Sequence, residues 1–315
     1  MRPWLSVFIL WLLVGNVFAA SPKPPREVVI NGVEFLHIPG GKFYYPVARR
    51  ENRDKGFIMD NLQLKEIRAE VDAFYIAKFE ARARDFSELL NTGRLASVND
   101  YLPRAGSRGD GATEGCSVRR NDSGSFFLTR PEDDLPATHL SWNLARDFAH
   151  AMGFRLPTNA EWTRAFRGDD RRMFPWGNEH PDDTFAAFQE GATQCHVQPV
   201  NGFAKGRSPY GVFNMAGNVF EFVQDWHNHP YTDSLADGVK NPVATEPWKA
   251  PWNDEPEKML RGGRWASGVG EISMQANIDS FPPNQSFNCY GVRFAIDESE
   301  VRRHLAAGTA RVISE

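Results

Sequence analysis

Polar side chains that can bind a metal ion lie within an otherwise apolar stretch, residues 210–226. Asn214, Asn218 and Glu221 place three oxygen-bearing side chains in this run, and Gly217 allows the backbone to bend so that its carbonyl groups converge. Buried polar groups need partners, and a hard cation held by side-chain and backbone oxygens would satisfy several of them. The acidic residues lack the alternate spacing of an EF-hand loop. The stretch therefore predicts either a cation site or a strand whose polar groups pair within the protein.

Two further groups of residues have types suited to chemistry. His227 and His229 lie at alternate positions, as on one side of a strand, and Asp225 would be a third metal ligand. Two imidazoles alone do not complete a zinc site, so the alternative is the exposed end of a strand. The Cys195–His196 pair indicates either an activated thiol or a disulfide partner beside a surface histidine, and we expect the second.

The chain contains three cysteines, Cys116, Cys195 and Cys289, at spacings of 79 and 94 residues. Spacings of this length exclude a compact zinc knuckle. In an oxidising compartment three cysteines allow one disulfide and leave one thiol. The sequence leaves the pairing open, so all three are candidates for the disulfide.

The first residues are typical of a secretory signal. Arg2 precedes an apolar run at residues 4–14, and Val17-Phe18-Ala19 fits the small-x-small cleavage rule. The run is shorter than a membrane span, so we expect residues 1–19 to be a cleaved signal peptide. The mature chain would then lie outside the cytoplasm with no membrane span; the alternative is an uncleaved membrane anchor. The formal net charge of −4 argues against binding to nucleic acid.

Local sequence patterns between residues 28 and 161 predict a domain of mixed strands and helices. Asn31-Gly32 is typical of a tight turn, here between two strands within residues 28–38. Apolar spacing predicts a helix over residues 83–90. A second helix follows Ser141 as its N-cap, and residues 158–161 form a capping box that starts a third.

Several segments have few apolar residues. Residues 46–69 are rich in charge, and we expect them to form an insertion. We expect residues 94–135 and 228–258 to form long polar excursions on the surface. Residues 298–315 predict a polar tail with a short helix. We find no internal repeat, low-complexity tract or separable linker, so we expect a single domain.

Residues 210–222 (YGVFNMAGNVFEF) also resemble the Y-G-L-x-N-x-x-G-N-x-x-E-W signature of the formylglycine-generating-enzyme (FGE-sulfatase) superfamily. Other family segments occur in the same order: 35–43 (FLHIPGGKF), 73–80 (AFYIAKFE), 136–142 (PATHLSW), 155–162 (RLPTNAEW), 174–178 (FPWGN), 261–265 (RGGRW) and 290–295 (YGVRFA). A single motif of this kind is weak, whereas an ordered series that covers about residues 33–297 identifies the chain as similar to this family.

The resemblance implies an irregular α+β fold related to C-type lectins, with short strands, few helices and long ordered loops. The expected organisation is a signal peptide at 1–19, a leader and first strand at 20–32, an FGE-sulfatase-like domain at 33–297 and a polar tail at 298–315.

The resemblance also implies calcium ligands. The family's second calcium site uses an Asn, a Glu and backbone oxygens between them, and Asn214, Gly217, Val219 and Glu221 have that spacing. We therefore expect one structural Ca²⁺ there. The family's first calcium site needs an Asn where this chain has Ala187, so that site is weakened.

Copper is not expected. In the copper-dependent oxidases of the family, two cysteines follow the Gly-Gly strand, and their soft thiolates suit Cu(I). This chain has no cysteine from residue 264 to residue 288, and Cys289 comes only two residues before Gly291. The resemblance therefore does not extend to formylglycine generation.

Two secreted branches of the family lack this cysteine pair. One is the TagR-type periplasmic regulator of type VI secretion, which acts with an outer-membrane lipoprotein and stimulates a membrane-spanning Thr kinase. The other is PvdO, which oxidises a siderophore chromophore precursor in the periplasm. The weakened first calcium site and the long polar excursions favour the first, so we expect a regulator that binds an envelope protein. A lectin-like glycan binder is a third possibility.

Overall fold

The computed structural model describes residues 23–47, 65–95, 117–190, 192, 197–251, 255–274 and 278–314. The strands are β1 (Glu27–Ile30), β2 (Val33–Ile38), β3 (Gly41–Val47), β4 (Lys65–Val71), β5 (Phe74–Ala77), β6 (Val118–Arg120), β7 (Phe126–Leu128), β8 (Phe220–Trp226), β9 (Lys258–Arg261), β10 (Ile278–Phe281), β11 (Tyr290–Val292), β12 (Ala295–Asp297) and β13 (Ala310–Ser314). The helices are α1 (Ala83–Asn91), α2 (Trp142–Ala151), α3 (Asn159–Arg167), α4 (His229–Ser234), α5 (Val269–Ile272) and α6 (Glu298–Ala306), with a 3₁₀ turn at Ala204–Gly206.

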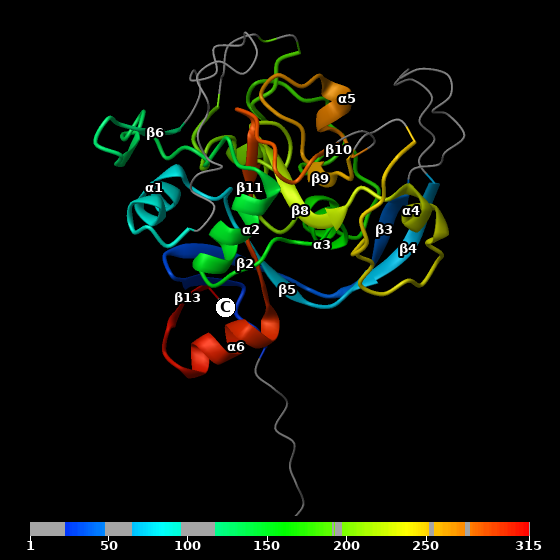
Figure 1. Ribbon diagram of the computed structural model, residues 1–315. Coiled ribbons are helices and arrows are strands. Elements are labelled where there is room, and N and C mark those ends of the chain that lie inside the picture. The colour runs from blue at the N-terminus through cyan, green and yellow to red at the C-terminus, as the bar shows by residue number, and fades with distance from the viewer. Residues whose placement is uncertain are drawn as a thin grey trace, which may run out of the picture.

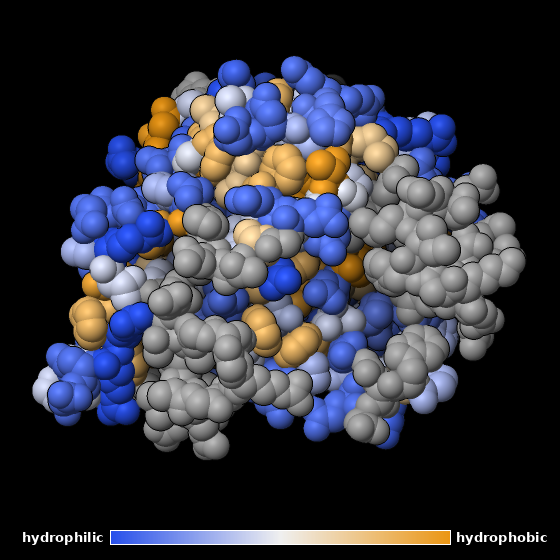
Figure 2. Space-filling model, turned by 90° about the horizontal axis from the view of Figure 1, so that it is seen from above, coloured by the Kyte–Doolittle hydropathy of each residue, from blue (hydrophilic) through white to orange (hydrophobic). Residues whose placement is uncertain are grey.

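Two sheets form the frame of the molecule (Figure 1). The lower sheet in that view has the strand order β12-β5-β2-β1-β13, and the upper sheet has the order β10-β9-β8-β11. Two-stranded ribbons, β3–β4 and β6–β7, lie outside the main sheets. Short strands, few helices and long connections are the α+β architecture that the sequence predicts. Figure 2 looks onto the upper end of the molecule, where a patch of hydrophobic residues is bordered by hydrophilic ones.

The hairpin predicted at residues 28–38 is confirmed. Asn31 and Gly32 both have left-handed backbone angles, with φ of 48° and 82°, as the two-residue turn of a twisted hairpin requires. The predicted polar tail contains the expected helix, α6. It also contains β13, which pairs antiparallel with β1 and places Val312 opposite Val28. The tail therefore completes the edge of the lower sheet.

The predicted insertion at residues 46–69 is shorter than expected at both ends. Strand β3 continues to Val47, and β4 begins at Lys65 and pairs with it in register. In β4 every second residue near its end is buried, namely Ile67, Ala69 and Val71. This alternating pattern covers only three residues, so it is a weak strand signal in the sequence. Within the excursion at 94–135, residues 94–95 and 117–135 are described, and the second range includes the β6–β7 hairpin. The excursion at 228–258 contains α4.

The predicted helix caps are confirmed. The Ser141 hydroxyl accepts a hydrogen bond from the Leu144 amide at 3.2 Å. At α3, the Thr158 hydroxyl accepts from the Glu161 amide at 3.1 Å, and the Glu161 carboxylate accepts from the Thr158 amide at 2.8 Å. These reciprocal bonds satisfy two amides that the helix itself leaves without partners.

A buried carboxylate fixes the start of α3 against β8. Asp225 Oδ2 accepts a hydrogen bond from the Asn159 amide at 2.7 Å, and Oδ1 accepts from the Ala244 amide at 2.9 Å. Burial raises the pKa of Asp225 to about 6, although these two hydrogen bonds oppose the shift. Asp225 thus joins the helix, the strand and the excursion that follows the strand.

We expect Asp225 to make stability depend on pH. Its pKa is higher in the folded chain than in the unfolded one, so its stabilising effect is complete below about pH 4 and is lost as the pH rises through about 6. The free energy of unfolding should fall by on the order of 2–3 kcal/mol more in the wild type than in Asp225→Asn across this window. Urea titrations between pH 4 and 7 measure this difference, with Asp122→Asn on an exposed turn as the control. Equal slopes in wild type and Asp225→Asn would contradict it.

Candidate cation centre

Five polar side chains form a buried centre between the two sheets. Glu80, Asn214, Asn218, Glu221 and Arg293 are each at most 5% exposed. Glu80 follows β5, the two asparagines precede β8, Glu221 lies in β8 and Arg293 lies between β11 and β12. The sequence predicted three of these five as oxygen donors.

Glu221 is held by an ion pair. Its Oε1 lies 2.6 Å from Arg293 Nη2, and its Oε2 accepts from Arg293 Nε at 3.0 Å and from Trp162 Nε1 at 2.7 Å. Arg293 also donates to the carbonyl oxygens of Ala77 at 3.1 Å and Phe213 at 2.8 Å. Both charged side chains are fully buried, so each depends on the other for compensation.

Glu80 holds the two asparagines. Asn214 Nδ2 donates to Glu80 Oε2 at 2.9 Å, and Asn218 Nδ2 donates to both oxygens, at 3.0 and 3.2 Å. Burial raises the pKa of Glu80 to about 8; Arg293 lowers it, Glu221 raises it, and the two amides lower it. Glu80 was not predicted from the sequence. Its only signal there is an acidic residue three positions after a strand whose four residues are all buried.

The backbone before β8 turns sharply. Asn214, Gly217 and Asn218 have φ values of 52°, 78° and 61°, in the left-handed region that Gly tolerates best and Asn tolerates better than most residues. A Cβ atom at residue 217 would lie 2.2 Å from the carbonyl oxygen of Ala187. Gly217 is therefore required both for its backbone angle and for this close approach.

The side-chain oxygen of Asn214 is the feature of this centre that best fits a hard cation. Asn214 Oδ1 is buried and has no hydrogen-bond partner in the described chain, which is costly unless something else binds it. Among the described residues, no three His, Cys, Asp or Glu side chains are grouped to hold a metal. A cation here would thus depend on amide and backbone oxygens, with Asn214, Gly217 and Val219 as donors and Glu221 shared with Arg293. Calcium at this centre stays a prediction.

The other predicted ligands are arranged differently. His227 and His229 are brought together, with ring centroids 4.4 Å apart, and His227 Nδ1 lies 2.7 Å from Ser280 Oγ. Asp225 uses both carboxylate oxygens on backbone amides elsewhere. The structure therefore assembles the two imidazoles without the third ligand that the sequence suggested.

The thiols are only partly described. Cys116, Cys195 and His196 lie outside the described residues, so the disulfide and the activated-thiol alternative stay predictions. Cys289 is fully buried, and its Sγ accepts a hydrogen bond from Arg264 Nη1 at 3.5 Å.

The segment after Gly263 is packed without a cysteine. A Cβ atom at Gly263 would lie 2.9 Å from Ile272 in α5. Ser267 is fully buried, and its hydroxyl accepts from the Arg264 amide at 3.0 Å. Cys289 is in contact with Arg264, so one sulfur lies near this segment even though it is distant in sequence.

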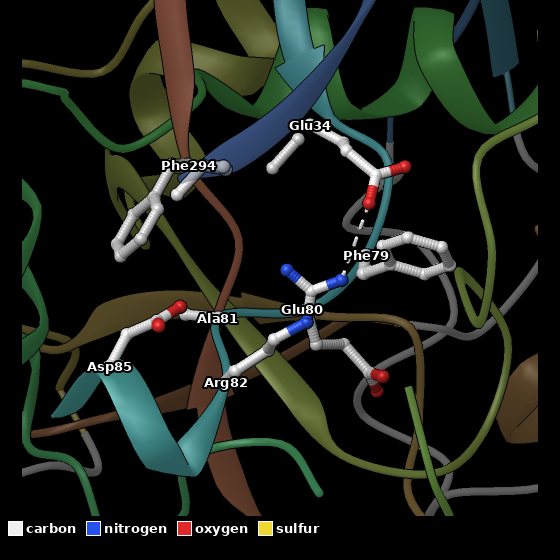
Figure 3. A pocket seen from close by; sticks show the side chains of 9 residues that line it. Glu34, Phe79, Glu80, Ala81, Arg82, Asp85 and Phe294 are labelled. Carbon is white, nitrogen blue, oxygen red and sulfur yellow. Dashed lines mark ion pairs between the residues drawn. The ribbon is translucent and has the colours of Figure 1, made fainter. Parts of the chain in front are cut away.

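A small pocket borders the centre at Glu80 (Figure 3). Arg82 faces Glu34 across it, with Arg82 Nη2 and Glu34 Oε1 3.6 Å apart. Burial raises the pKa of Asp85, which also lines the pocket. The Glu80 carboxylate points away from the Arg82 guanidinium. Glu80 therefore lines the pocket, while its carboxylate bonds to the asparagines of the buried centre.

The family profile of the sulfatase-modifying factor enzyme 1-like domain (FGE-sulfatase) matches residues 20–298. The inactive C-alpha-formylglycine-generating enzyme 2 of Bos taurus is 28% identical over 335 residues, covering 92% of this chain and 95% of that protein. The Bos taurus formylglycine-generating enzyme is 27% identical over 250 residues, covering 67% of this chain and 61% of the enzyme. The chain thus spans less than two thirds of the active enzyme's length.

Two other similarities are informative. The serine/threonine-protein kinase pkn1 of Chlamydia pneumoniae is 32% identical over 161 residues, which cover 51% of this chain and 24% of the kinase. The structure of PvdO from Pseudomonas aeruginosa aligns with a TM-score of 0.56 at 19% identity, covering 87% of this chain and 99% of PvdO. At that identity the likeness concerns the fold. No helix in the described segments is long and apolar enough to cross a membrane.

We expect Ca²⁺ to raise the melting temperature and EDTA to lower it, because a ligand of the native state alone stabilises it. Asn214→Ala should remove this increment, since it deletes the oxygen that lacks a partner. Glu221→Ala should also destabilise the protein in EDTA, by about 3–5 kcal/mol, because Arg293 is left buried and unpaired. Calorimetry with and without Ca²⁺ measures both effects, with exposed Asn284→Ala as the control. A wild type indifferent to Ca²⁺ and EDTA would refute the site.

We expect one reactive cysteine per chain, and only after unfolding. Cys289 has 0% exposure, so alkylation of the native protein should leave it unmodified. Alkylation in denaturant without reductant, followed by mass spectrometry, should label one of the three cysteines and find the other two joined. Three labelled cysteines would contradict both the disulfide and the extracytoplasmic location.

Proposed function

Because the chain belongs to the FGE-sulfatase family, we propose that it is a periplasmic, protein-binding regulator that does not generate formylglycine. The observation that carries the proposal is the packing after Gly263. Residues 264–274 contain no cysteine, and Ile272 of α5 lies in the space beside Gly263. Cu(I) chemistry needs soft ligands, and Cys289 offers one buried sulfur rather than a pair.

The relatives support a role without formylglycine chemistry. The bovine protein that is similar over nearly the whole chain is named as an inactive member of the family. The likeness to a serine/threonine-protein kinase extends over half of this chain and supports an association with phosphorylation. A fold can keep its architecture while its chemistry changes, so these likenesses favour regulation without specifying a partner.

The partner that we propose is an envelope protein: an outer-membrane lipoprotein, the periplasmic domain of a Thr kinase, or both. In the type VI secretion pathway this protein would stimulate the kinase. Phe127 supports a recognition role for the excursion at 94–135, because it is 44% exposed in the middle of β7, where it pairs with Arg119 of β6. Exposed apolar side chains on loops held by a rigid scaffold often serve recognition.

The test uses the mature protein as bait in envelope extract of its own source. We expect it to retain a Thr kinase or lipoprotein identified by mass spectrometry, and loss of its gene to lower phosphothreonine in envelope proteins. Phe127→Ser should weaken capture at least tenfold. Val312→Ser is the matched control, because Val312 is 43% exposed but lies on β13. Equal capture by wild type and Phe127→Ser would place recognition elsewhere.

A chemical assay tests the other half of the proposal. The purified mature protein is supplied with Cu(I), O₂ and a cysteine peptide of the sulfatase type. We expect no formylglycine above a copper-only control. One equivalent per chain would refute the proposed absence of this activity.

A PvdO-like oxidation is a second candidate, favoured by the fold similarity that covers 99% of PvdO. In that case a chromogenic small molecule rather than a protein would co-purify with the chain. A glycan-array screen addresses the lectin-like alternative. Either result, together with no protein partner, would replace the regulator proposal.

A further inference from the structure

We propose that Glu80 is a positioning residue for a hard, oxygen-binding cation, because its carboxylate fixes the Asn214 amide with Oδ1 turned toward the cation. Glu80 itself need not touch the ion. This inference concerns the buried centre alone and does not depend on the regulatory role proposed above.

The orientation of an asparagine amide is set by its hydrogen bonds. Asn214 Nδ2 donates to Glu80 Oε2 at 2.9 Å and to the Val200 carbonyl oxygen at 3.2 Å. Both acceptors would meet an oxygen if the amide were reversed. Asn214 Oδ1 is therefore the end of the amide that remains buried without a partner, and it is available as a metal ligand.

Glu80 is itself held in place by a second amide. Asn218 Nδ2 donates to both Glu80 oxygens. The Asn218 amide is fixed in turn by the backbone of Gln198, since its Oδ1 accepts from the Gln198 amide at 2.9 Å and its Nδ2 donates to the Gln198 carbonyl at 3.2 Å. A series of hydrogen bonds thus runs from the Gln198 backbone through Asn218 and Glu80 to Asn214, and it fixes the orientation of the Asn214 amide.

A carboxylate suits this task better than a neutral acceptor. Its two oxygens accept from two amides at once, and the described hydrogen bonds of Glu80 all come from amide nitrogens. Arg293, the nearby guanidinium, is bonded to Glu221 instead.

Glu80→Gln tests the proposal with little change of shape. The glutamine side chain keeps one oxygen that can accept a hydrogen bond. Its NH₂ group replaces the second oxygen, and it would face an asparagine N–H that can only donate. We expect the Asn214 amide to reverse so that its Oδ1 accepts from the new amide, which removes it from the cation. Ca²⁺ affinity should fall at least tenfold, and the rise in melting temperature with Ca²⁺ should disappear.

The probe is Tb³⁺, which occupies oxygen-rich Ca²⁺ sites and emits when a nearby tryptophan is excited. Trp162 donates to Glu221 within the centre, so sensitised Tb³⁺ emission reports occupancy, and competition by Ca²⁺ gives the affinity. Glu88→Gln, on the exposed side of α1, is the matched control. The double substitution Glu80→Gln with Asn214→Asp should restore binding, because a carboxylate can accept from the amide and still offer an oxygen to the ion. A role limited to stability would not give this rescue.

Three outcomes would overturn the proposal. The first is a wild type with neither sensitised emission nor a Ca²⁺-dependent melting shift. The second is Glu80→Gln with wild-type affinity, and the third is failure of the double substitution to recover binding. If Glu80→Gln does not melt cooperatively, Asn218→Gly replaces it, because glycine accepts the φ of 61° and the substitution removes both the link to Glu80 and the two bonds to the Gln198 backbone that orient it. Unchanged affinity in that variant also overturns the proposal.

Discussion

The two sheets are joined through the buried ion pair between Glu221 and Arg293. Arg293 lies in the short link where the chain leaves β11 of the upper sheet and enters β12 of the lower sheet. Its guanidinium reaches the Ala77 carbonyl in β5, on the lower sheet, and Glu221 in β8, on the upper sheet. Both charges are fully desolvated, which is tolerable only because each satisfies the other at close range. Trp162 extends the same contact to α3.

The cation centre is built onto this junction, which explains why its residues serve two purposes. Glu221 compensates Arg293, so its charge is not reserved for a metal ion. Asn214 has one end of its amide occupied and the other without a partner. An ion bound there would stabilise a junction that already has its own ion pair. This arrangement separates the fold from the metal: loss of the ion would weaken the centre, whereas loss of Glu221 or Arg293 would remove the link between the sheets.

The sequence predicted the elements whose signals are local. The Asn31-Gly32 turn, the Ser141 cap and the capping box at Thr158 each depend on residues close in the chain, and each is confirmed. Strand β13 was not predicted, because its pairing partner β1 lies at the other end of the chain. Glu80 and Arg293 were likewise missed as members of the centre, since their partners are 138 and 72 residues away. The spacing of residues in the sequence indicates which side chains are suited to bind a metal ion. It does not indicate which charged residue from a distant part of the chain will pair with them.

The same separation explains how a member of this family can do without a cysteine pair. The segment after Gly263 packs through Ile272 and the buried Ser267 hydroxyl, and none of these contacts involves the Glu221–Arg293 pair. A change at Ile272 or Ser267 therefore removes no contact of the Glu221–Arg293 pair. Exposed features such as the β6–β7 hairpin are likewise attached to the frame rather than part of it. A scaffold with these properties can lose one chemistry and retain a surface for recognition, because the residues that hold it together are distinct from those that would act.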